Sequence, residues 1–93
     1  MDMTQPFPRI DGELWVGERR VTELVGEFGS PLYIYDARLI EAAYRRMESA
    51  FSGVDLLLAY SVKANSNLEI LRRLNALGAG ADIVSRGELH RCL

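Results

Sequence analysis

The sequence predicts an α/β domain built on a parallel sheet. In its second half, segments typical of helices and of strands alternate in the order helix, strand, helix, strand, helix. Such alternation is typical of parallel strands joined by right-handed crossovers. The run from Val54 to Val62 is almost entirely apolar, which favours a strand covered on both faces. Two capping-box motifs predict a helix start soon after each of the two strands.

The first part of the chain is expected to be less regular. Residues 1–13 are rich in proline, glycine and charge, and they are predicted to form a loop that leads into a short strand near Leu14–Val16. Apolar residues at helical spacing predict a helix from Val21 to Phe28, ended by Gly29. Aromatic and β-branched side chains predict another short strand over residues 31–35.

The clearest helix is predicted from Ala37 to Phe51. Asp36 is suited to be its N-cap, and Gly53 closes the segment. One face of this helix carries an apolar stripe, which consists of Leu39, Ile40, Ala43, Tyr44, Met47, Ala50 and Phe51.

The two capping boxes define the remaining elements. The box Ser66–Glu69 opens a helix that runs to Leu77, and Gly78 is placed to end it. The buried stripe of this helix is expected to consist of Leu68, Leu71, Leu74 and Leu77. A strand is predicted over Ala81–Val84, and the box Ser85–Glu88 opens a last helix.

Composition excludes several classes of function. The 93 residues carry a formal net charge of -2, without the clustered basic residues that nucleic-acid binding needs. No apolar run is long enough to cross a bilayer, and the first residues do not resemble a secretory signal. The single cysteine, Cys92, excludes an internal disulfide and fits a reducing cytosol. With one histidine, His90, beside it, a structural zinc site is not expected.

Lys63 is the most informative residue in the sequence. It follows the apolar run and precedes the helix start at Ser66. A lysine held by a buried strand loses hydration, which favours the neutral amine and lowers its pKa. A neutral amine is a nucleophile that condenses with aldehydes. The alternative is an ordinary lysine that caps a strand and points to water, which is the commoner role of such a short motif.

Asp82 is the second candidate site residue. It lies near the end of the next predicted strand, and parallel strands about 4.8 Å apart bring their ends to one edge of the sheet. Asp82 could therefore approach Lys63 and favour its protonated form. The alternative is a buried acid satisfied by loop N–H groups. The helix starts at Ser66 and Ser85 could bind phosphate, but capping is the favoured role for both.

Four segments resemble those of diaminopimelate decarboxylases, in the same order. They are Asp11–Leu14, Gly29–Asp36, Tyr60–Asn65 and Gly80–Leu89, so the resemblance covers Asp11 to Leu93. It implies the N-terminal part of a pyridoxal-phosphate-binding (β/α)8 barrel of the alanine-racemase-like fold type III. Residues 1–35 would belong to a β-domain, and residues 36–93 to the first βα units of an incomplete barrel.

The resemblance also implies the chemistry of the site. Lys63 matches the catalytic lysine that binds pyridoxal 5′-phosphate covalently, and Asp82 matches an acid that lines the cofactor pocket. The implied reaction converts meso-2,6-diaminopimelate to L-lysine and CO₂, without a metal. The chain departs from many relatives at Arg86, where they have a glycine. This position is expected at a helix start, away from the chemistry.

A whole barrel needs about 250 residues. The resemblance therefore implies an N-terminal fragment that is inactive and marginally stable alone. The parent protein would be a cytoplasmic homodimer acting on a small amino acid, with no nucleic-acid or membrane partner. Three alternatives stay open: a decarboxylase of the same fold acting on ornithine, arginine or carboxynorspermidine; a non-catalytic relative that binds pyridoxal phosphate; and an unrelated α/β domain with a surface Lys63.

Overall fold

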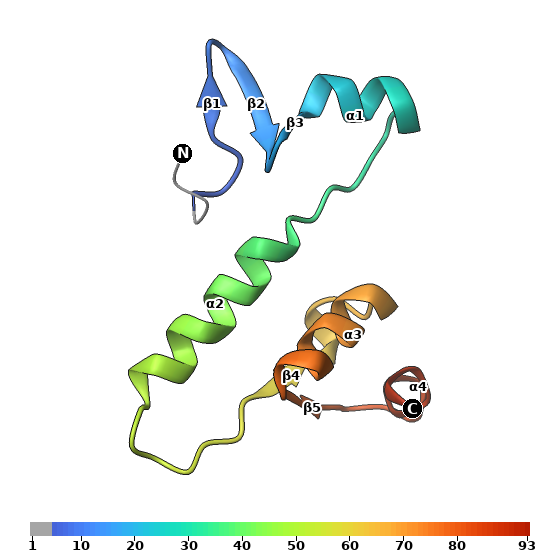
Figure 1. The fold of residues 1–93 in the computed structure, drawn as a ribbon. Coiled ribbons are helices and arrows are strands. Elements are labelled where there is room, and N and C mark those ends of the chain that lie inside the picture. The colour runs from blue at the N-terminus through green and yellow to red at the C-terminus, as the bar shows by residue number, and fades with distance from the viewer. Residues whose placement is uncertain (1–4) are drawn as a thin grey trace. The chain divides into compact units, whose positions relative to one another are not determined.

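A computed structural model describes residues 5–93, which form two compact units. The first unit comprises Met1–Leu39 and the second Ile40–Leu93 (Figure 1). Residues 1–4 lie outside the described part of the chain. The predicted N-terminal loop begins in these residues, and so does the stretch predicted to carry no secretory signal.

The first unit contains a small antiparallel sheet. Its strands are β1 (Arg9–Ile10), β2 (Glu13–Val16) and β3 (Arg19–Arg20), in that spatial order. The strand predicted near Leu14–Val16 is confirmed as β2. The loop predicted up to residue 13 is only partly right, because Arg9–Ile10 form β1 and pair with β2. Asp11 and Gly12 connect these strands with φ angles of 51° and 81°, as a type I′ hairpin turn requires.

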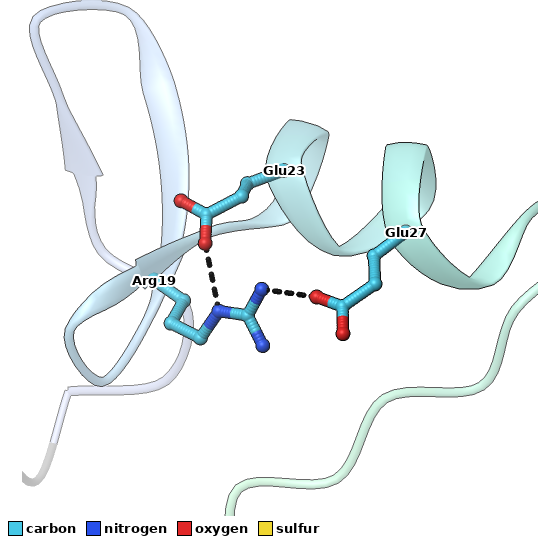
Figure 2. Close-up of polar contacts among 3 residues, drawn as sticks. All are labelled: Arg19, Glu23 and Glu27. Atoms are coloured by element: carbon cyan, nitrogen blue, oxygen red, sulfur yellow. Dashed lines mark hydrogen bonds and ion pairs between the residues drawn. The ribbon is translucent and has the colours of Figure 1, made fainter.

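Helix α1 (Val21–Phe28) follows β3 directly and confirms the predicted helix. Gly29, at a φ of 85°, ends it, and its N–H donates to the carbonyl of Val25. Arg19 joins β3 to this helix (Figure 2). Its Nε donates to Glu23 at 2.8 Å, and its Nη2 donates to Glu27 at 2.5 Å. The hydrogen bond to Glu27, and then that to Glu23, raises the pKa of the Arg19 guanidinium.

The strand predicted over residues 31–35 is wrong. These residues have no regular structure, and Tyr33 is 88% exposed. Aromatic and β-branched residues favour a strand only where a neighbouring strand accepts its hydrogen bonds, and within residues 5–93 no strand pairs with this segment.

Helix α2 (Ala37–Ala50) matches the predicted long helix to within one residue. Asp36 caps it as expected, because its Oδ1 accepts from the backbone N–H of Arg38 at 3.0 Å. The apolar stripe of α2 is not buried, and both Met47 and Phe51 are about half exposed.

The second unit holds the predicted parallel sheet. Strand β4 (Ala59–Ser61) pairs with β5 (Gly80–Asp82) in parallel, and α3 (Leu68–Leu77) connects them. The strand predicted over 54–62 is too long, because only its last part has a partner among the described residues. Val54 and Leu57, expected to be covered on both faces, are 61% and 73% exposed.

The core of the second unit is small. Its buried side chains are Val62, Ile70 and Leu74. The stripe predicted for α3 is therefore only partly right: Leu74 is buried, Leu68 is exposed, and Ile70 takes a place that the leucine spacing did not predict. Gly78 ends α3 in the left-handed region, at a φ of 100°, as predicted.

The two predicted capping boxes have different outcomes. The N-cap of α3 is Asn67, whose Oδ1 accepts from the N–H of Glu69 at 2.9 Å, so the box at Ser66 is wrong by one residue. The second box is confirmed. Ser85 caps α4 (Arg86–Cys92), and its Oγ accepts from the N–H of Glu88 at 3.1 Å. In the described part of the chain, no helix is long and apolar enough to span a membrane.

Candidate functional site

Lys63 lies in a short turn at the carboxyl end of the parallel sheet. β4 ends at Ser61, and a single 3-10 turn (Val62–Ala64) follows at once. Val62 is fully buried and anchors the turn, whereas Lys63 is exposed. The dehydrated lysine expected from the sequence is thus not found in this chain, because the strand ends two residues before it.

Hydrogen bonds within the second unit order the loop around Lys63. The N–H of Asn65 donates to the carbonyl of Val62 at 3.2 Å, which completes the 3-10 turn. The hydroxyl of Tyr60, one residue before the end of β4, donates to the carbonyl of Asn65 at 2.8 Å. Asn65 Oδ1 accepts in turn from the N–H of Asn67, the cap of α3. The loop from Val62 to Asn67 is therefore an ordered connection rather than a free one.

Helix α4 contributes to the same region. Arg91 Nε donates to the carbonyl of Ser66 at 2.9 Å, although the two residues are 25 positions apart. At the other end of α4, Glu88 Oε1 accepts from the N–H of Val84 at 3.0 Å, which completes the capping of this helix. The second capping box thus orients the helix whose last turn contacts the Lys63 loop.

A pocket of about 570 Å³ opens between this loop and α4. The loop supplies Val62, Lys63 and Ser66, and α4 with its cap supplies Ser85, Gly87, Glu88, His90 and Arg91. The volume is in the usual range for sites that bind small molecules. A larger hollow of about 760 Å³ lies over α3 and the end of the chain, but it lacks Lys63 and any other primary amine. We therefore assign the candidate site to the smaller pocket.

Asp82 lies at the same end of the sheet but outside this pocket. As the last residue of β5, it is paired in register with Ser61, two positions before Lys63. Asp82 is exposed, and within residues 5–93 neither it nor Lys63 forms a hydrogen bond or an ion pair. The structure thus places both predicted residues at one sheet edge without joining them directly, and their roles stay predictions.

The chemistry of the pocket residues fits a phosphorylated aldehyde. Lys63 offers a primary amine without a partner among the described residues, as condensation with an aldehyde needs. Lys63 and Arg91 add two positive charges to the lining, against one carboxylate from Glu88. An anionic group is therefore favoured there.

Sequence reasoning missed Arg91 and His90 as parts of this site. A signal for Arg91 exists, because Gly87 and Glu88 lie four and three positions before it and so share one face of α4. The capping box already fixed the start of that helix, and its face could have been followed to Arg91.

Comparison with known proteins places these residues in a family. Residues 37–93 match the pyridoxal binding domain of the pyridoxal-dependent decarboxylases. The chain therefore belongs to the pyridoxal-dependent decarboxylase family, and pyridoxal phosphate is its cofactor.

Individual relatives and a solved structure within this family are diaminopimelate decarboxylases. The chain is 47% identical over 87 residues to a diaminopimelate decarboxylase of Pseudomonas aeruginosa, covering 94% of this chain and 21% of the relative. It is 45% identical over 80 residues to one of Aquifex aeolicus, covering 86% and 19%. A crystal structure of the M. jannaschii diaminopimelate decarboxylase in co-complex with L-lysine matches at a TM-score of 0.88 and 37% identity, covering 99% of this chain and 23% of that one.

These matches confirm the predicted α/β fold as part of a pyridoxal-phosphate-binding barrel. They also confirm the resemblance to diaminopimelate decarboxylases stated from the four sequence segments. The chain spans about a fifth of the length of the curated relatives that it matches.

Proposed function

We propose that the full-length protein containing this chain decarboxylates meso-2,6-diaminopimelate to L-lysine and CO₂. The exposed amine of Lys63 carries this proposal, because it lines a pocket of suitable size within the region that matches the pyridoxal-binding domain. The names of the relatives, and the L-lysine complex of one of them, support this choice of substrate and product.

Lys63 would hold pyridoxal phosphate covalently through its Nζ. When bound, this cofactor supplies the electron sink for the loss of CO₂. The residues of this chain would bind the cofactor and orient the reacting amine. Val62 anchors the turn in the core, the loop presents the amine to the pocket, and Lys63 can accept or return a proton at Nζ. Asp82, at the end of β5, would stabilise positive charge near that nitrogen.

We also propose that the chain contributes to two domains of the full-length protein. Residues 1–35 would be part of a β-domain and residues 36–93 the first βα units of the barrel, which is supported by the match that begins at residue 37. Exposed apolar side chains such as Leu57 and Val84 support the view that further parts of a barrel cover this unit. The chain alone is then inactive and marginally stable. A cytoplasmic homodimer is proposed for the full-length protein.

A substrate panel tests this function. The purified full-length protein, loaded with pyridoxal phosphate, is assayed for CO₂ release from diaminopimelate, ornithine, arginine and carboxynorspermidine, with Lys63→Ala as control. We expect release from diaminopimelate only, and its loss in the variant. Release from another amino acid would move the assignment to a neighbouring decarboxylase. No release from any of them, with the cofactor still bound at Lys63, would identify a non-catalytic relative.

A further inference from the structure

Two side chains bind the backbone directly after Lys63. Tyr60, from β4, donates to the carbonyl of Asn65, and Arg91, from α4, donates to the carbonyl of Ser66. The two carbonyls are adjacent in the chain and lie two and three residues after Lys63. They are thus fixed by two separate elements of the second unit, one strand and one helix (Figure 1).

Neither carbonyl has a partner in the helix that follows. The first intrahelical hydrogen bond of α3 runs from the N–H of Leu71 to the carbonyl of Asn67, so the carbonyls of Asn65 and Ser66 lie outside it. Backbone carbonyls outside regular structure need other donors, and here Tyr60 and Arg91 supply them. These two side chains therefore fix the loop from outside, in addition to its own hydrogen bonds.

We infer that Tyr60 and Arg91 are positioning residues for Lys63. With Val62 buried on one side of Lys63 and the carbonyls of Asn65 and Ser66 held on the other, the turn that carries the amine is fixed at both ends. Arg91 also lines the pocket beside Lys63, so its bond to Ser66 joins the two walls of the site. This inference rests on the proposed function of Lys63.

A group held in place reacts faster than one that must find its geometry, and a misplacement of about 1 Å can cost two orders of magnitude in rate. Loss of the Arg91 contact should therefore slow both the attachment of pyridoxal phosphate and turnover. Substrate binding should change little, because Arg91 acts through the loop and not on the amino acid.

The test compares Arg91→Met, Arg91→Lys and Tyr60→Phe in the full-length protein. Arg86→Met is the matched control, since Arg86 begins the same helix and forms no hydrogen bond or ion pair within residues 5–93. The readouts are the rate constant for pyridoxal phosphate attachment to the cofactor-free protein, kcat, KM for diaminopimelate, and Tm.

We expect Arg91→Met to lower the attachment rate constant and kcat about tenfold, because it removes one hydrogen bond from a charged donor. KM should stay within about twofold of the wild-type value. Arg91→Lys should recover part of the rate, because it keeps a charged donor of similar reach. Tyr60→Phe should show the same pattern as Arg91→Met. Arg86→Met should equal the wild type.

Equal rates in Arg91→Met and Arg86→Met would overturn the inference, as would a loss that appears only in Tm. If Arg91→Met does not fold, Tyr60→Phe and Arg91→Lys decide by the same readouts. Lys63→Ala separates the positioning role of Arg91 and Tyr60 from the proposed function of Lys63. Cofactor attachment that survives Lys63→Ala refutes the proposed function itself, whereas attachment lost in Lys63→Ala and unchanged in Arg91→Met refutes only the positioning role.

Discussion

Asp82 is paired in register with Ser61, two positions before Lys63, in the parallel sheet of β4 and β5. Asp82 therefore ends β5, and Lys63 lies in the turn that follows the neighbouring strand β4, at the edge where ligands bind in α/β folds. The proposed role of Asp82, to stabilise positive charge near the Lys63 nitrogen, can be tested separately from the role of Lys63.

The neutral variant Asp82→Asn should lower kcat about tenfold, because a carboxylate near the reacting nitrogen stabilises positive charge there. Asn keeps the shape of the side chain, so the fold should be preserved. The matched control is Asp55→Asn, an exposed aspartate without a hydrogen bond or ion pair in the described chain. Turnover of the two variants is compared in the full-length protein, and equal kcat values would remove Asp82 from the site.

Gly17 should not tolerate a side chain. It is buried and has a φ of 60°, a left-handed conformation that strains any residue with a Cβ, and the flexible end of Arg38 would also have to move aside. Gly17→Ala should therefore lower the free energy of unfolding by about 1–3 kcal/mol. Gly26→Ala is the control, because Gly26 lies inside α1 with open space around it and alanine is the better helix former. Denaturant unfolding should rank Gly26→Ala above the wild type and Gly17→Ala below it.

The corrected cap of α3 gives a stability prediction. Asn67→Ala should cost about 1 kcal/mol, because it removes the acceptor for the N–H of Glu69. Ser66→Ala should cost less than about 0.5 kcal/mol, since the Ser66 hydroxyl caps no helix. Thermal unfolding of both variants decides between the two caps, and a larger loss for Ser66→Ala would restore the capping box expected from the sequence.

Arg19 should add a small stability increment that is independent of pH in the physiological range. Its folded-state pKa is raised, chiefly by Glu27, so its contribution is complete below the unfolded pKa and is lost only as pH rises through the folded one. Both values are strongly alkaline. The Tm difference between the wild type and Arg19→Met should thus be equal at neutral and mildly alkaline pH. It should shrink in high salt, because the pairs are exposed. A difference that changes between the two pH values would contradict this account.

The sequence was most informative where the deciding interactions are local. Helices α1 and α2 follow from apolar spacing, and the cap of α4 follows from the interval between Ser85 and Glu88, since each of these interactions lies within about a turn of helix. The β1–β2 hairpin was missed although Asp11-Gly12 is a recognised signal for it.

Errors occurred where a partner decides the structure. Residues 31–35 and 54–58 have the composition of strands, but a strand needs a neighbour that the described chain does not give them. Lys63 could be singled out from the apolar run and the helix start around it. The contact of Arg91 with Ser66 could not be predicted, because it joins residues 25 positions apart and depends on how α4 packs.

The central claim is that Lys63 holds the cofactor. The most direct measurement is borohydride reduction of the full-length protein in the presence of pyridoxal phosphate, followed by peptide mass spectrometry. The account predicts the added mass on the peptide that contains Lys63, and its loss in Lys63→Ala. Modification of another residue, or of none, would contradict it.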